Sequence, residues 1–312
     1  MQVDAGTYGA LLLGALFASG LSGVFGVQCL LYFKCYPTDK KALKALVVFA
    51  WGLEITHTAL VWISVWSYFV QHFGEVDYID HIPTSIALSV MLTATLTFLA
   101  HCLFAHRIYY LSEHNWWLAM PVIVLALGRL AAASVSGAEM IHLRSFARFR
   151  KQFLWLFSLG LSLSSAVDIL ITLSLFLLLR KSRRQSVKLN YLIDALLLYT
   201  FEIGSLTSAA TVASMLCWST LDKSLVFLGF HFVIGKLYAN SLLATLNSRR
   251  KLRKARSTAF NDFVNFNVNQ SATVSAIQFQ NSENQPGESD TRLADSMSDP
   301  EALKNGENDT EE

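Results

Sequence analysis

Seven long apolar segments constrain the fold of this chain more than any other feature of its sequence. Each is about 21 to 27 residues long, and they cover residues 9–33, 46–70, 84–108, 116–136, 153–179, 193–217 and 225–246. A helix needs about 20 mostly apolar residues to cross a bilayer, and only a helix satisfies all its backbone hydrogen bonds within one such segment. The sequence therefore predicts an all-α integral membrane protein, a seven-transmembrane-helix bundle.

Composition agrees with a lipid-facing surface. The chain is 53% hydrophobic and 15% charged, whereas soluble domains have about 25% charged residues. The formal net charge of +2 hides a strong local charge pattern and says little about nucleic acid; we expect no nucleic-acid partner. The cysteines have neither zinc-site nor disulfide-framework spacing, and we expect no cofactor and no metal; they are Cys29, Cys35, Cys102 and Cys217.

The chain divides into a transmembrane domain, residues 1–248, and a polar C-terminal segment, residues 249–312. The segment opens with a basic block expected at the membrane surface, formed by Arg249, Arg250, Lys251, Arg253 and Lys254. Beyond it the residues are mostly Ser, Thr, Asn, Gln, Asp and Glu, a composition that predicts a disordered tail. Ser296 and Ser298 each precede an acid by three residues, so they are candidate phosphorylation sites.

Basic residues in the connections predict the orientation, because cytoplasmic loops are enriched in Lys and Arg. Sixteen flank the segments on the side of the C-terminus and five on the other side. We therefore expect the N-terminus outside, the C-terminus in the cytoplasm and a plasma-membrane location. The run HLRSFARFRKQF opposes this bias; we expect an amphipathic surface helix there, with Phe146 and Phe149 facing lipid.

Several polar residues lie deep within the apolar segments. Counting about 1.5 Å per helical residue places one group near the same level at mid-membrane: Glu54, His57, Asp168, Glu202, Lys236 and Asn240. A lone intramembrane charge is expensive, so we expect Lys236 to pair with Glu202 or Asp168. The layer is either an ion pair that fixes helix register or the floor of a ligand or ion site.

Two further patterns concern helix packing and metal binding. Small residues recur four apart, as in Ser19 with Gly23 and Ser22 with Gly26, which predicts close helix packing. A metal site could be built from His57, His101 and His231 in three different segments, but we do not expect one; His101 and His106 are five residues apart and not at the four-residue spacing that puts two metal ligands on one helix face.

Two familiar seven-helix classes are excluded. Retinal proteins also have a lysine in the last helix, but four residues before Lys236 the chain has Phe232 where they have an acid, and 84–108 contains no carboxylate. Rhodopsin-like receptors have an acid-Arg-Tyr run and an Asn-Pro motif, and neither is present here.

Three stretches match another group: SSAVDILITLSLFLLLRKSR, LIDALLLYTFEIGSLTS and GKLYANSLLATLNSRRKLR. They resemble a family of seven-helix membrane proteins from mushroom-forming fungi that is known only as a domain of unknown function. The resemblance covers 158–253 closely and the earlier segments loosely. It implies the membrane fold and no established activity.

Our leading functional hypothesis is a receptor-like sensor of a small ligand with a cytoplasmic signalling partner, in contact with the lipid bilayer. A transporter or proton-coupled carrier that uses Asp168, Glu202 and Lys236 is the alternative, followed by a non-catalytic membrane organiser. We do not expect an enzyme. Much of this rests on analogy of fold.

Overall fold

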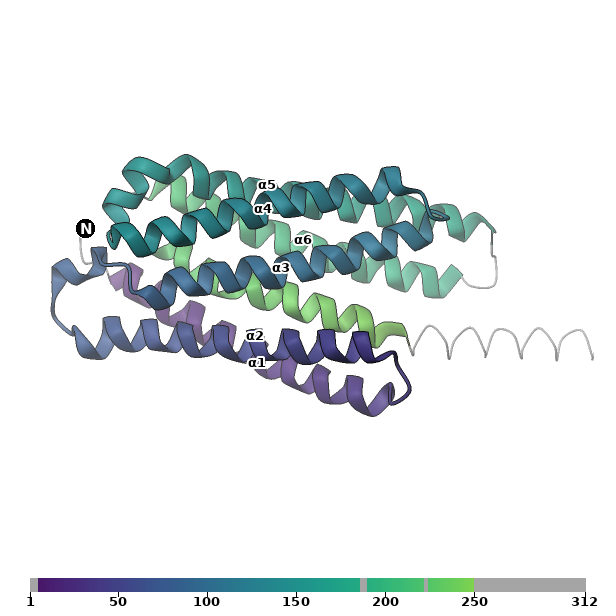
Figure 1. The fold of residues 1–312 in the computed structure, drawn as a ribbon, viewed down its shortest axis with the longest axis horizontal. Helices are drawn as coiled ribbons and strands as arrows, with labels where there is room; N and C mark the ends of the chain where they lie inside the picture. Colours follow the sequence, from purple (N-terminus) through teal and green to yellow (C-terminus); the bar gives the residue numbers. More distant parts are fainter. Residues whose placement is uncertain (1–4, 186–189, 222–223, 250–312) are drawn as a thin grey trace, which may run out of the picture. The chain divides into compact units, whose positions relative to one another are not determined.

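The computed structural model describes residues 5–185, 190–221 and 224–249, and describes side chains there except at 5, 76, 182–185 and 190–203. Its elements, in chain order, are α1 (Ala5–Cys35), α2 (Lys41–Trp66), the π-helical turn η1 (Ser67–Gln71), the 3-10 turn η2 (Val76–Asp80), α3 (Thr84–Leu111), α4 (Trp116–Leu143), α5 (Phe146–Gln185) and α6 (Asn190–Thr220). A further helix, Val226–Arg249, has no label in Figure 1 and is called the C-terminal helix below.

Consecutive helices run in opposite directions along the bundle (Figure 1). Within the described residues, six are long and apolar enough to cross a membrane: α1, α2 with η1, α3, α4, α5 and the C-terminal helix. The expected segment 193–217 lies inside α6, which has 31 residues. An all-helical integral membrane protein is therefore supported, and the count of seven spans stays a prediction.

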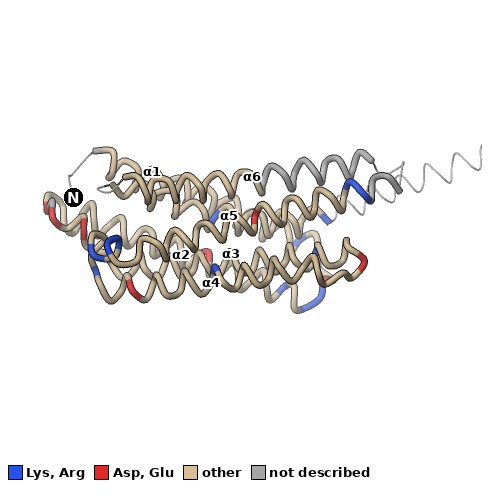
Figure 2. Tube along the Cα trace, turned by 90° about the horizontal axis from the view of Figure 1, so that it is seen from above, with Lys and Arg blue, Asp and Glu red and all other residues tan. Residues whose placement is uncertain are grey.

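The C-terminal helix and α3 form the interior of the bundle. In their most apolar windows 72% and 56% of the residues are buried, compared with 28% in α1, α2 and α4. Large apolar side chains on the outer helices point away from the bundle, and Phe17 is 67% exposed. Charged residues gather toward the two ends, with few in between (Figure 2). Such an apolar exterior is stable only in lipid.

The start of α5 differs from our expectation. Residues from Phe146 onward are helical, but Phe146 and Phe149 are 2% and 0% exposed, so they face the bundle and not lipid. Phe149 lies against Trp218, with 6.0 Å between ring centroids. The helical period showed that the two rings share a face, but it could not show that α6 covers that face.

Glycines allow several close helix contacts, though not at the predicted pairs of α1. A Cβ on Gly14 would lie 2.5 Å from Cα of Gly229, so α1 and the C-terminal helix touch there. In contrast, a Cβ on Gly23 or Gly26 would meet nothing within 4 Å. The prediction of close packing at Gly23 and Gly26 was therefore wrong, and this part of α1 borders open space.

Candidate functional site

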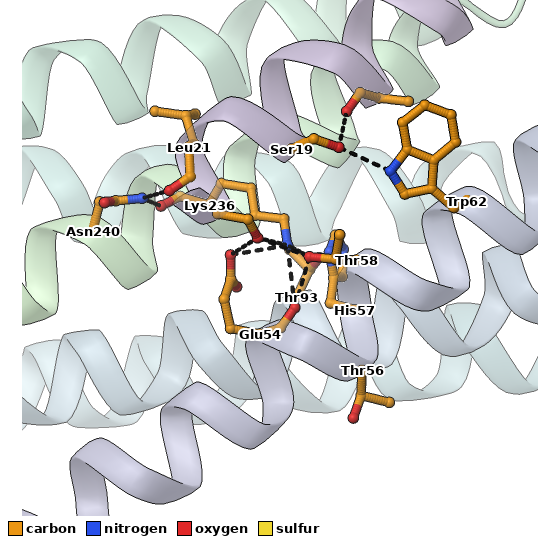
Figure 3. A network of polar contacts seen from close by, with 12 residues as sticks. Ser19, Leu21, Glu54, Thr56, His57, Thr58, Trp62, Thr93, Lys236 and Asn240 are labelled. Atoms are coloured by element: carbon orange, nitrogen blue, oxygen red, sulfur yellow. Dashed lines mark hydrogen bonds and ion pairs between the residues drawn. The ribbon is translucent and has the colours of Figure 1, made fainter. Parts of the chain in front are cut away.

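Lys236 lies fully buried on the C-terminal helix and binds side chains of α1 and α2 (Figure 3). Its Nζ lies 2.9 Å from Oε1 of Glu54 and donates to Oγ1 of Thr58 at 2.6 Å and Oγ of Ser22 at 3.1 Å. An ammonium group has three protons to donate. Its hydrogen-bonding capacity is therefore already used within the protein.

Glu54, from the middle of α2, is the counter-ion of Lys236. We expected Glu202 or Asp168, and that pairing was wrong for Asp168, which lies in a different cluster; the side chain of Glu202 lies outside the described residues. Depth along a helix gives the level of a residue in the bundle, but not which helix it faces. Because a buried cation needs an opposite charge, the pair holds α2 against the C-terminal helix.

The second carboxylate oxygen of Glu54 is different. Oε1 binds Lys236 and also accepts from Ser22 Oγ at 3.0 Å. Oε2 is buried and has no hydrogen-bond partner among the described residues. Nearly all buried polar atoms in proteins have a hydrogen-bond partner. Oε2 is therefore an unusual feature of this network, a buried acceptor that is not used.

A cleft of about 430 Å³ lies beside this network, between α1 and α2. Its lining residues are Ser22, Gly23, Trp51, Glu54, Ile55, Thr58, Ala59 and Trp62. Trp62 reaches across from α2, and its Nε1 donates to Ser19 Oγ on α1 at 2.9 Å (Figure 3). The cleft opens at the apolar surface of the bundle, since Ile55 is 58% and Trp62 39% exposed.

Asn240 and His57 belong to the same region but do not bind the Lys236 ammonium. Nδ2 of Asn240 donates to the backbone oxygens of Leu21 at 3.0 Å and of Lys236 at 2.8 Å. This contact joins the C-terminal helix to α1. Nε2 of His57 lies 3.0 Å from Oγ1 of Thr93, which joins α2 to α3.

Asp168 forms a second buried cluster. Its Oδ2 accepts from the Tyr238 hydroxyl at 2.5 Å, and its Oδ1 lies 3.3 Å from Nε2 of His101. Ser164 Oγ lies 2.9 Å from the same hydroxyl. Asp168 thus links α5 to α3 and the C-terminal helix, without meeting Lys236.

Arg129 is a buried cation that our sequence analysis missed. It lies in α4, is 5% exposed, and its guanidinium carbon lies 5.8 Å from the centroid of the Tyr238 ring. Its position well inside the segment 116–136 was the available signal, because a charge at that depth is rarely incidental. Among the described side chains, the buried Lys, Arg, Asp and Glu residues are thus two basic and two acidic ones: Lys236, Arg129, Glu54 and Asp168.

Arg249, the first residue of the predicted basic block, is held by the protein. Its Nη2 lies 2.5 Å from Oδ2 of Asp39, and its guanidinium carbon lies 4.7 Å from the centroid of the Tyr36 ring. The rest of the block and both candidate phosphorylation sites lie outside the described residues: Arg250, Lys251, Arg253, Lys254, Ser296 and Ser298.

The three candidate metal-binding histidines do not form one cluster. His57 binds Thr93 and His101 lies next to Asp168, while neither ring nitrogen of His231 has a hydrogen-bond partner among the described residues. Within the described ranges, no three or more His, Cys, Asp and Glu side chains gather so that they could hold a metal ion.

Part of the chain matches a known protein family. Residues 164–251 match the model of a family of unknown function, DUF6534. The matched part covers less than a third of the chain and includes Asp168 and Lys236 but not Glu54. No curated protein and no solved structure matches the chain. Together, the structure and the family match support a helical, membrane-like protein with a domain of unknown function.

Proposed function

We propose that this protein is a seven-span, receptor-like sensor that detects a small ligand in the cleft between α1 and α2. One observation supports the proposal most strongly. Ser22, Glu54 and Thr58 line the cleft and also bind the ammonium group of Lys236. A ligand that changes the hydrogen bonds of these side chains therefore changes what holds the C-terminal helix.

The C-terminal helix is well placed to transmit such a change. It is the most buried of the described spans and continues to Arg249, where it contacts the connection between α1 and α2 through Asp39. Ligand binding at mid-bundle would shift this helix between two positions relative to α1. Coupling between two sites of this kind is typically worth about 1–3 kcal/mol.

The proposal includes the orientation and location predicted from the sequence. The N-terminus lies outside, the C-terminus lies in the cytoplasm, and the membrane is the plasma membrane. The basic block and the following polar segment would then meet a cytoplasmic signalling partner. No catalytic step is part of this function.

Charge balance favours the sensor over a proton-coupled carrier. A proton-coupled carrier needs an intramembrane acid that gains and loses a proton during transport. Among the described side chains the buried cations and carboxylates are equal in number, and Glu54 has its own lysine. Asp168 is bound by Tyr238 and His101, which suits a fixed structural position.

Reconstitution in vesicles separates the two functions. Purified protein is incorporated into vesicles that contain a pH-sensitive dye, and a proton gradient is imposed with and without protein. If the protein is a sensor, vesicles with and without protein should lose the proton gradient at the same rate. A protein-dependent proton flux that Asp168→Asn abolishes would support the carrier instead.

A further inference from the structure

The position of the cleft indicates where its ligand comes from. Its polar lining is at the middle of both helices: Ser22 and Glu54 each lie at least 12 residues from either end of α1 and α2, respectively. One wall is the exposed apolar side chain of Ile55. In a membrane this opening faces the acyl chains and not water. A ligand would therefore enter laterally from the bilayer.

Part of this space exists because α1 has a glycine, and therefore no side chain, at position 23. Gly23 lines the cleft, and an added Cβ there would meet nothing within 4 Å. The volume of about 430 Å³ falls within the range of about 300–1,000 Å³ that is typical of small-molecule sites. Its apolar walls, with Trp51 and Trp62, suit a hydrocarbon body.

The polar end of the cleft restricts the ligand further. Lys236 and Glu54 cancel each other's charge, and Lys236 has no remaining proton to donate. The unused group is Oε2 of Glu54, and an ionised carboxylate accepts hydrogen bonds but donates none. The matching ligand group is a neutral donor.

We propose that the cleft binds a neutral, membrane-dissolved amphiphile whose hydroxyl group donates to Oε2 of Glu54, such as a long-chain alcohol. Glu54 is 2% exposed, so the hydroxyl reaches Oε2 when Ser22 or Thr58 rotates aside. That rotation removes an acceptor from Lys236, which links binding to the C-terminal helix. This inference rests on the proposed function and names the ligand class.

The test uses a photoreactive long-chain alcohol as the probe, with the purified full chain in phospholipid vesicles. Competitors are the unlabelled alcohol and its methyl ether, which has the same chain but no donor. Gly23→Leu fills the cleft. Gly9→Leu is the matched control, because a Cβ there also meets nothing within 4 Å and Gly9 does not line the cleft.

We expect labelled peptides from α1 and α2 around the cleft. The alcohol should compete about tenfold better than the ether, the factor expected for one hydrogen bond to a charged acceptor. Gly23→Leu should lose most of the labelling and Gly9→Leu should keep it. Equal competition by alcohol and ether, or unchanged labelling of Gly23→Leu, would overturn the proposal.

The outcome is separable from that of the sensor proposal. If the ether competes as well as the alcohol but signalling proteins still associate with the C-terminus, the proposed ligand class is wrong and the sensor proposal is retained. If the alcohol binds as expected but no signalling protein associates, the site is correct and the sensor fails.

Discussion

Nζ of Lys236 lies 2.9 Å from Oε1 of Glu54, and the two side chains are 0% and 2% exposed. The pair joins the most buried span to a lipid-facing helix. Removing one partner of such a buried pair typically costs about 3–5 kcal/mol, whereas replacing both can be nearly neutral.

Single substitutions in this pair should therefore be much worse than the double one. We expect Lys236→Met to lower stability by about 3–5 kcal/mol, because it leaves a buried carboxylate alone. Adding Glu54→Gln should restore most of the loss. Thermal unfolding of the detergent-solubilised protein measures both, and a double variant as unstable as the sum of the singles would show that the two residues do not interact.

The hydroxyl of Tyr238 should stabilise the second cluster. Tyr238→Phe removes a hydrogen bond to the charged Asp168 and one to Ser164, so we expect a loss of about 1.5–3 kcal/mol. Tyr110→Phe is the control, since that side chain is 58% exposed. The same unfolding assay applies, and equal effects of the two substitutions would contradict the role of the Asp168 contact.

The contact between α1 and the C-terminal helix should tolerate no side chain at Gly229. A Cβ there would lie 2.5 Å from the backbone oxygen of Ala10, and overpacking of this kind costs about 1–3 kcal/mol. Gly23→Ala should be close to neutral, because its Cβ would meet nothing within 4 Å. Comparison of the two variants by thermal unfolding checks this; a stable Gly229→Ala protein would mean that the helices are farther apart.

The proposed orientation predicts which connections are accessible from outside the cell. With the native cysteines replaced, a cysteine at exposed Asp77 should react with a membrane-impermeant maleimide on intact cells. A cysteine at exposed Lys40, at the other end of α2, should react only after permeabilisation. The reverse labelling pattern would show that the N-terminus lies in the cytoplasm and that the proposed orientation is wrong.

The apolar segments and their helical nature could be predicted from sequence because lipid leaves the backbone no alternative. Helix rise predicted a shared level for Glu54, Asp168 and Lys236, and the contact between Glu54 and Lys236 agrees with it for that pair. The partners of these residues could not be predicted, because facing residues depend on how each helix is rotated in the bundle. The same missing information explains the errors at Phe149 and Gly23: a pattern identifies a face, and only packing shows what covers it.

The most direct test of the sensor is proximity labelling by an enzyme fused after Glu312, comparing the wild-type chain with the Lys236→Met, Glu54→Gln double variant in the native host. The sensor predicts that the wild type labels cytoplasmic signalling proteins and that the double variant, though folded, labels them less. Labelling of secreted proteins, or of cytoplasmic proteins without any signalling component, would contradict it.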